Sequence, residues 1–172
     1  MRHWPRLVIT AVLGARLLAQ NIDEYQVKAA FISNFANFIE WPPDAFKTAQ
    51  DPLTVCVLGR NPFGSSLSRI LTGKVVGGHP VELRAIEDAE AERCHVLFVS
   101  SSAHLRLRAI LNGIRARSIF SVGDTNDFLA EGGIANLKTD QGRVRIEINA
   151  AAARAGNLHI SSRLMSVAKI VN

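Results

Sequence analysis

Blocks of apolar residues with two different periods follow one another along the chain. In residues 23–40, apolar side chains recur at steps of three and four positions, and many of them are phenylalanine. This period predicts an amphipathic helix with a broad apolar face. Pro42 and Pro43 follow, and proline disfavours helical geometry in the residue before it, so we expect the helix to end at about Glu40. The phenylalanines are expected to pack in the core, or else to form an exposed strip used in dimerisation.

Short β-branched runs then alternate with segments of helical period. This βαβ order predicts a mostly parallel sheet with helices on both faces. Asp124 follows the last of these strands and is expected to cap a helix that runs to about Ala130. The expected strands are residues 53–58, 81–86, 96–100 and 119–122, and the other expected helices are residues 63–71 and 105–114.

The C-terminal part of the chain breaks this order. Residues 134–138 and 144–148 flank a turn cluster at residues 140–142, which favours an antiparallel hairpin. A short helix after Asn149 and a final amphipathic helix over residues 162–170 complete the expected elements. The predicted fold class is therefore α/β, with a mostly parallel sheet flanked by helices and a C-terminal antiparallel hairpin.

The first residues have the order of a secretory signal. Arg2 and Arg6 precede an apolar run at residues 7–13, and a small residue stands at a plausible cleavage point. The apolar run is too short to span a bilayer. We therefore expect residues 1–19 to be a cleaved signal peptide and residues 20–172 to form one α/β domain in the periplasm. The alternative is an N-terminal amphipathic helix that packs on the domain.

Removal of the signal peptide would lower the net charge of the chain. Of the 20 Lys and Arg residues, three lie in the signal segment, which leaves 17 against 15 Asp and Glu residues, a net charge of +2. This charge is too small for the electrostatic footprint of a nucleic-acid-binding domain, so we expect no nucleic-acid partner. Four arginines at helical spacing are expected on a solvated helix face: Arg106, Arg108, Arg115 and Arg117.

The chain has two cysteines, Cys56 and Cys94. In an oxidising compartment, two cysteines in one domain indicate one disulfide, whereas in the cytosol they would be buried small apolar residues. Cys56 lies in one expected strand and Cys94 just before another. Neighbouring strands lie about 4.8 Å apart, within the Cα separation that a disulfide tolerates. The sequence has no C-x-x-C pair, so a zinc site or thioredoxin-type motif is not expected.

Polar residues follow several of the expected strands, at the edge where parallel α/β sheets bind ligands. Arg60 and Asn61 come after the first strand, Ser101 after the third and Asp124 after the fourth. These four residues are candidates to line a small-molecule crevice; the alternative is that they form tight turns and helix caps. The pattern has no phosphate-loop motif, catalytic triad or metal-ligand spacing, so we expect no enzymatic activity, no cofactor and no metal.

Several stretches of the sequence match one known family in the right order. They are Glu24 to Pro42, Val55 to Gly64, Cys94 to Ser100, Ser121 to Asp124, Gly132 to Ile134, Arg143 to Asn149 and Ile160 to Leu164. With these stretches, from about residue 24 to residue 170, the chain resembles the YfiR family, small periplasmic proteins of bacteria. The best-known members repress a membrane-bound diguanylate cyclase.

The resemblance implies a homodimeric periplasmic α/β domain that binds the sensor domain of an inner-membrane cyclase and keeps the enzyme inactive. This role would place the protein in c-di-GMP signalling. It also implies a disulfide, because family members carry one at the positions of Cys56 and Cys94. Some members have a second cysteine pair nearer the C-terminus. This chain lacks that pair, so a redox switch that depends on it is not expected here.

The polar face of the late strand is the surface that we expect to contact the partner. Arg143, Arg145 and Glu147 alternate with apolar residues there, and the expected C-terminal helix lies nearby. Ordinary solvated charge is the simpler interpretation of the same residues. The alternative function is a periplasmic small-molecule-binding accessory protein for another membrane sensor or receptor.

Overall fold

Strand β2 (Leu53–Leu58) lies in the interior of the sheet, and all six of its residues are buried. Val55 and Val57 point into one apolar core, whereas Cys56 and Leu58 point into a second core on the opposite face. A strand with apolar side chains on both faces is typical of a parallel sheet that helices cover on both sides.

The computed structural model describes residues 24–171, and in them eight strands form one sheet. In chain order these strands are β2, β3 (Val75–Val76), β4 (His79–Ile86), β5 (Val96–Val99), β6 (Phe120–Gly123), β7 (Ala135–Asp140), β8 (Arg143–Asn149) and β10 (Lys169–Val171). Their order across the sheet is β10-β8-β7-β6-β5-β2-β4-β3. Only the β3–β4 and β7–β8 pairs are antiparallel among these described strands. The predicted fold class is therefore confirmed.

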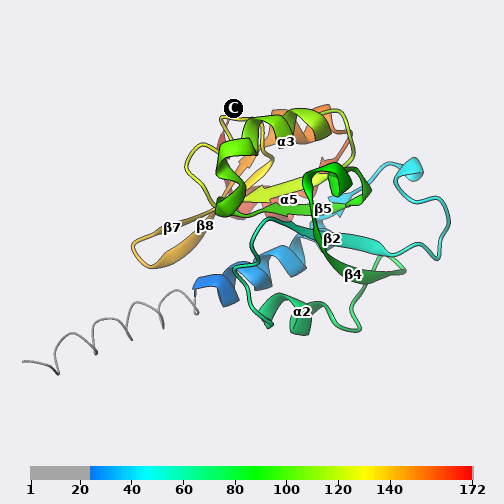
Figure 1. Cartoon of the computed structure of the whole chain (residues 1–172). Helices are drawn as coiled ribbons and strands as arrows, with labels where there is room; N and C mark the ends of the chain where they lie inside the picture. The colour runs from blue at the N-terminus through cyan, green and yellow to red at the C-terminus, as the bar shows by residue number, and fades with distance from the viewer. Residues whose placement is uncertain (1–23, 172) are drawn as a thin grey trace, which may run out of the picture.

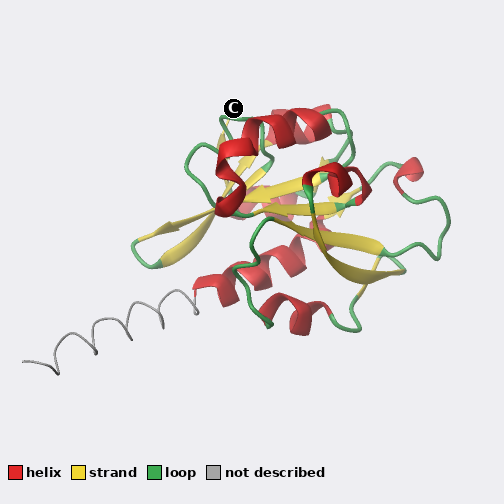
Figure 2. Ribbon diagram, viewed as in Figure 1, coloured by secondary structure: helices red, strands yellow, loops and turns green. Residues whose placement is uncertain are grey.

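Helices cover both faces of the sheet (Figures 1 and 2). One face carries α3 (Leu107–Ile114), preceded by a 3-10 helix, and α4 (Ala150–Ala155) lies beside it. The other face carries the first helix, residues 24–35, with α2 (Ser66–Leu71), and α5 (Ser162–Val167) joins the same core. The 3-10 segments are Ala36–Phe38, Pro43–Ala45, Asp88–Arg93 and Ser101–Arg106. Across residues 24–171, no helix has the length and apolar content needed to cross a membrane.

The first helix contributes most of its apolar face to the core. Ala29, Ile32 and Phe35 are almost fully buried, and the ring of Phe35 meets that of Phe120 edge to face, with centroids 5.4 Å apart. Burial of one such side chain stabilises folding by about 1.5–3 kcal/mol. The expectation that these phenylalanines pack in the core therefore holds for Phe35.

The first helix ends earlier than the sequence predicts. After residue 35 the chain tightens into a 3-10 turn and then forms β1 (Ile39–Glu40), which pairs with β9 (His159–Ile160) in a separate two-stranded sheet. The predicted continuation of the helix to Glu40 is wrong, because pairing with a distant segment outweighs the local helical period.

The segment after β6 is not the predicted helix over residues 124–130. It forms a series of turns around Phe128, whose side chain is fully buried. Gly123 and Gly133 flank the ring, and a Cβ at either position would lie 2.2 Å from a ring atom. The chain is thus wrapped around one aromatic side chain, which a helix capped by Asp124 would not allow.

The C-terminal segment also differs from its prediction. The predicted helix over residues 162–170 ends at Val167, and Lys169–Val171 forms strand β10, which pairs in parallel with β8. Strand β10 lies beside the last three residues of β8, so β8, the strand of the predicted partner surface, is second from the edge of the sheet there.

The predicted hairpin is present. Asp140 pairs with Arg143 across a two-residue turn in which Gln141 and Gly142 both have positive φ, at 49° and 73°. Two positive φ angles define a type I′ turn, which matches the twist of paired strands. The β7–β8 hairpin projects beyond the body of the domain (Figure 1).

The disulfide joins Cys56 in β2 to Cys94, directly before β5, with the two Cα atoms 5.9 Å apart. It links two neighbouring central strands on the face that α3 covers. The expected signal peptide, residues 1–19, lies outside the described residues and stays a prediction.

Reduction of the Cys56–Cys94 disulfide should destabilise the domain. In the chain-entropy model, a bridge between residues separated by 38 positions stabilises folding by about 4 kcal/mol. Thermal unfolding is expected to show a lower Tm after reduction, whereas a Cys56→Ser/Cys94→Ser variant should unfold at one Tm with or without reductant. Mass spectrometry that finds two free thiols in protein purified from the periplasm would contradict the bridge.

Candidate functional site

The turn after β2 and the turn after β5 meet at the carboxyl edge of the sheet. The backbone N–H of Arg60 donates a hydrogen bond to Oγ of Ser102 at 2.8 Å, and Ser102 Oγ donates to Ser100 Oγ at 3.2 Å. Gly59 has a φ of +87°, and a Cβ there would lie 2.7 Å from the Ser102 hydroxyl. This contact requires glycine at the turn.

The four predicted crevice residues differ in their surroundings, and a crevice lined by all four stays a prediction. Asn61 bonds within its own turn, where its Oδ1 accepts from the N–H of Phe63 at 2.9 Å. Arg60 and Ser101 are exposed, whereas the side chain of Asp124 is 3% exposed and bonds to the first helix. The arrangement agrees with the alternative interpretation of tight turns and caps for Asn61.

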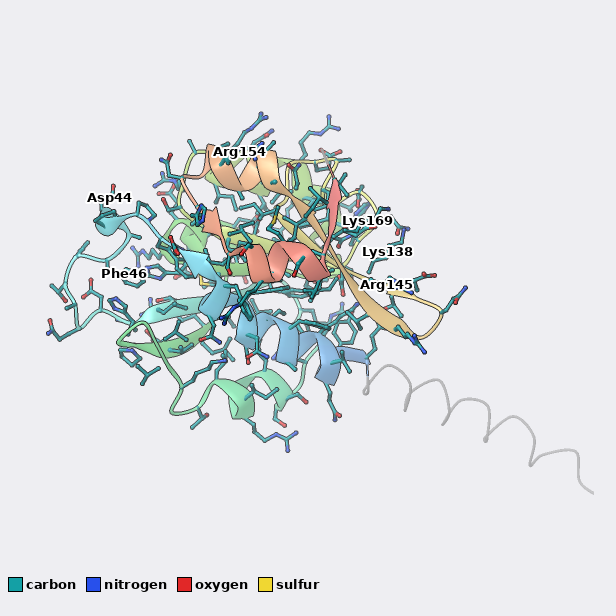
Figure 3. The ribbon with its side chains drawn as sticks, turned by 180° about the vertical axis from the view of Figure 1, so that it is seen from behind. Asp44, Phe46, Lys138, Arg145, Arg154 and Lys169 are labelled. Atoms are coloured by element: carbon teal, nitrogen blue, oxygen red, sulfur yellow. A yellow bond between two sulfur atoms is a disulfide. The ribbon has the colours of Figure 1, made fainter. Side chains whose placement is uncertain are left out.

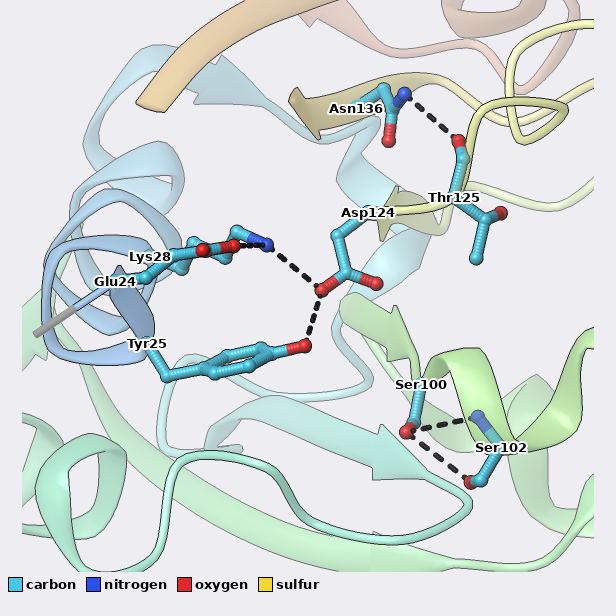
Figure 4. A network of polar contacts seen from close by, with 8 residues as sticks. All are labelled: Glu24, Tyr25, Lys28, Ser100, Ser102, Asp124, Thr125 and Asn136. Atoms are coloured by element: carbon cyan, nitrogen blue, oxygen red, sulfur yellow. Dashed lines mark hydrogen bonds and ion pairs between the residues drawn. The ribbon is translucent and has the colours of Figure 1, made fainter. Parts of the chain in front are cut away.

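Asp124 belongs to a buried polar network at the end of β6 (Figure 4). Its Oδ2 accepts hydrogen bonds from Oη of Tyr25 at 2.9 Å and from Nζ of Lys28 at 3.0 Å. Lys28 also contacts Oε1 of Glu24 at 2.6 Å. The Lys28 side chain is 4% exposed, so a buried ammonium group is shared between two carboxylates.

The electrostatics of this network favour a charged Glu24 carboxylate and a neutral Tyr25 phenol. Burial raises the pKa of the Glu24 carboxyl, but hydrogen bonds from Lys28 and Thr139 outweigh it and leave the pKa below its usual value. Burial, together with the charge of Asp124 and the hydrogen bond to it, raises the pKa of Tyr25 far above its usual value. Tyr25 therefore stays a hydrogen-bond donor at physiological pH.

Sequence reasoning missed this network. Glu24 and Lys28 stand four positions apart at the start of an otherwise apolar helix, which is the spacing of an ion pair on one face. That spacing could have indicated the pair, but Asp124 lies 96 positions away from Lys28. The contact also explains why Asp124 is unavailable to a ligand through its Oδ2 atom.

A stack of three rings holds the loop between β1 and β2 against the amino edge of the sheet. The Phe46 ring lies between His79, with centroids 3.8 Å apart, and His95, with centroids 4.3 Å apart. The two histidines also bond to the loop backbone. His79 Nδ1 lies 2.8 Å from the Asp51 carbonyl oxygen, and His95 Nε2 lies 3.1 Å from that of Ala45.

The hydrogen bonds of His95 fix its neutral form. A carbonyl oxygen can only accept, so Nε2 carries the proton toward Ala45, and Nδ1 accepts from the backbone N–H of Thr54 at 3.0 Å. Burial lowers the pKa of His95, and the bond to Ala45 offsets part of that effect. A second proton on Nδ1 would face the N–H of Thr54 and break this bond.

Two open hollows flank this loop. One, of about 520 Å³, is lined mainly by apolar and aromatic side chains, including Trp41 and Phe46. The other, of about 900 Å³, is lined mainly by polar and charged residues, with Cys94 and His95 among them. Both lie at the amino edge of the sheet, opposite the edge where the sequence pattern placed a crevice. Across the described residues, no group of three or more His, Cys, Asp or Glu side chains is placed to hold a metal ion.

The predicted partner surface lies on the projecting hairpin (Figure 3). Arg145 is 60% exposed and lies 3.4 Å from Asp140, and Glu147 lies 3.3 Å from Lys169 on β10. Lys138 stands directly opposite Arg145 across the two strands. Like charges in opposite positions destabilise a strand pair, so this surface carries charge that the fold itself does not favour.

Three of the four arginines around α3 are paired with carboxylates. Each of these pairs has a nitrogen–oxygen separation below 3 Å: Arg106 with Asp88 at 2.6 Å, Arg108 with Glu131 at 2.6 Å, and Arg117 with Glu92 at 2.8 Å. These contacts agree with a solvated helix face.

Replacement of Lys28 by methionine should be strongly destabilising, because Asp124 would remain buried without a counter-charge. We expect a loss of about 3 kcal/mol or more in the free energy of unfolding, measured by chemical denaturation. Lys169→Met makes the same substitution in an exposed ion pair and should cost less than about 1 kcal/mol. Lys28→Met/Asp124→Asn should recover part of the loss. Equal losses for the two single variants would show that the buried pair matters no more than a surface pair.

Acidic solution should weaken the fold through His95. Its pKa is lowered in the folded chain, so folding favours the neutral ring. This stabilisation is complete above the ordinary pKa of 6.5 and is lost as the pH falls through the folded pKa. Between about pH 7.5 and about pH 4.5, stability should fall more steeply in the wild type than in His95→Gln. The difference in slope cannot exceed about 1.4 kcal/mol per pH unit, the limit for one proton, and should be smaller because His95 is only partly buried. The exposed His159→Gln control should keep the wild-type slope; the same slope in His95→Gln would exclude His95 as the cause.

Comparison with known proteins identifies the fold and the family. A conserved domain protein from Vibrio cholerae matches with a TM-score of 0.52 and 14% identity, over 70% of this chain and 55% of that chain. An ABC domain from Streptococcus pneumonia, solved in complex with L-Trp, gives a TM-score of 0.49 and 11% identity, over 69% of this chain and 55% of that chain. The chain thus spans about half the length of each of these two proteins. The similarity to the Vibrio cholerae protein supports the α/β fold and nothing more.

No protein of curated function matches the sequence. The model of one family, described as YfiR/HmsC-like, matches residues 25–169, which is most of the chain. The matched region begins in the helix that carries Lys28 and ends at the first residue of β10. The chain therefore belongs to the YfiR/HmsC-like family.

Proposed function

We propose that this protein is a periplasmic regulator that binds the sensor domain of an inner-membrane diguanylate cyclase and holds the enzyme inactive. Membership of the YfiR/HmsC-like family over residues 25–169 is the observation that carries the proposal. The best-known proteins that the sequence resembles act in this way.

Repression of this kind requires only differential binding. A regulator that binds the inactive state of the cyclase more tightly than the active state shifts the population toward inactivity. A shift from 1% to 99% inactive requires an affinity ratio of about 10⁴ between the two states. A rigid surface can supply this difference without a catalytic residue.

We assign the contact with the cyclase to the polar face of the hairpin, with Arg143, Arg145 and Glu147. The hairpin projects from the domain, and Lys138 and Lys169 add positive charge beside Arg145. Exposed charge that the fold does not favour supports a role in binding. We also expect the protein to form a homodimer, and light scattering of the purified chain measures this directly.

Charge reversal at Arg145 should impair repression without unfolding the domain. In a strain that lacks this gene, cellular c-di-GMP is expected to rise, and the wild-type chain should return it to the parental level. Arg145→Glu should leave it close to the level of the deletion strain, and Glu147→Lys tests the same face with the opposite change. The control is Arg154→Glu, which reverses an exposed charge on α4, away from the hairpin (Figure 3).

Three outcomes of this experiment are informative. Repression by Arg145→Glu that equals repression by Arg154→Glu, with both proteins folded, would exclude the hairpin as the contact. A c-di-GMP level that does not respond to the wild-type chain would argue against cyclase repression. That result would favour the alternative of an accessory protein for another membrane sensor or receptor.

A further inference from the structure

Strand β10 covers only part of β8. Lys169–Val171 pairs with Glu147–Asn149, whereas β7 pairs with β8 over its length from Arg143 to Ile148. In the described part of the chain, residues 143–146 of β8 therefore have no strand on their outer side. A short segment of open sheet edge is left at the base of the hairpin.

The hydrogen-bond pattern shows which backbone groups face this open edge. The N–H of Asn149 donates to the carbonyl of Ile134 at 2.8 Å, so residue 149 belongs to a hydrogen-bonded pair with β7. In an antiparallel pair the bonded residues alternate, and Arg143 and Arg145 are therefore bonded to β7 as well. The N–H and C=O groups of Val144 point outward, toward the open edge.

An apolar groove of about 430 Å³ lies against this edge. Phe31 of the first helix, Val144 and Ile146 of β8, and Val167 of α5 contribute its apolar lining. Val167 is 72% exposed, which is unusual for a large aliphatic side chain. An added strand would place every second side chain in this groove.

The other face of an added strand would meet positive charge. Arg145 and Lys169 also line the groove and are 60% and 74% exposed, and Lys138 stands opposite Arg145. A second copy of this chain is a poor occupant, because pairing of two such edges would bring Arg143 and Arg145 of both copies together. A segment in which acidic and apolar residues alternate fits both faces.

We propose that the open edge of β8 at Val144, with the groove beside it, binds an extended segment of the partner in which acidic and apolar residues alternate. The partner segment adds to the sheet as a strand beside β8, in line with β10, so that backbone hydrogen bonds supply affinity and the groove and the cations supply selectivity. The inference rests on the proposed function for the identity of the partner, a membrane-bound cyclase.

Val144→Pro tests the edge directly. Proline removes an N–H that points outward, which edge strands tolerate, so the hairpin should still form. Val144→Ala is the matched control, because it shortens the same side chain and keeps the N–H. In the deletion strain, Val144→Ala should restore the low c-di-GMP level and Val144→Pro should not, with both proteins folded by circular dichroism. Equal repression by the two folded variants would overturn strand addition while leaving cyclase repression intact.

A second measurement does not depend on the cyclase. A synthetic peptide that alternates glutamate and valine, added to the purified exported chain, should shift the amide NMR signals of Val144 and Ile146. Its affinity should fall at least about tenfold in Val144→Pro and for a peptide that alternates lysine and valine, as expected when backbone bonds and charge both contribute. Binding elsewhere, or equally tight binding to Val144→Pro, would overturn the inference. A wild-type chain that binds this peptide at Val144 but does not change c-di-GMP would instead contradict the proposed function alone.

Discussion

Burial of both faces of the central parallel strands is the constraint on which the rest of the structure depends. Strands β2, β5 and β6 are buried throughout, so helices must cover the sheet on both sides. The first helix does this with its phenylalanine-rich face, but it also carries Lys28 into the buried region. A shift of the helix by one turn would separate Lys28 from Asp124 and leave both charges buried without partners, which is costly. The ion pair therefore fixes where the helix docks, while apolar burial supplies the stability.

The pattern of apolar and polar residues predicted those helices and strands whose ends are set by residues next to them in the sequence. Strand β2 has the predicted bounds, because a β-branched run is bounded there by Pro52 and Gly59. The hairpin follows from turn chemistry at residues 141–142. The errors are at residues 36–40, 124–130 and 168–170, where distant contacts decide the structure: the first segment pairs with β9, the second wraps around Phe128, and the third pairs with β8. None of these contacts produces a periodic pattern of apolar residues, so the pattern alone could not reveal them.

In the candidate sites too, contacts that follow from the local sequence could be predicted, and contacts between distant segments could not. The cysteine pair could be predicted because the chain has two cysteines and both fall at expected strands. Asp124 was placed at the correct edge of the sheet, but its partner could not be deduced, since Lys28 reaches it from a helix far away in sequence. The ring stack joins Phe46, His79 and His95 from three separate segments, and no spacing links them. Side chains that meet through tertiary packing thus remain outside the reach of motif reasoning.

The hairpin carries charges that are better explained by selectivity than by stability. Lys138 and Arg145 face each other although like charges in this position weaken strand pairing, and Asp140 and Glu147 only partly balance the nearby cations. An open sheet edge must also be protected from association with other copies, and charged residues are a common protection. Arginines at residues 143 and 145 discourage contact between two copies and at the same time attract an acidic segment. The same side chains therefore protect the edge from self-association and make it selective for an acidic partner. The Cys56–Cys94 disulfide holds strands β2 and β5 together.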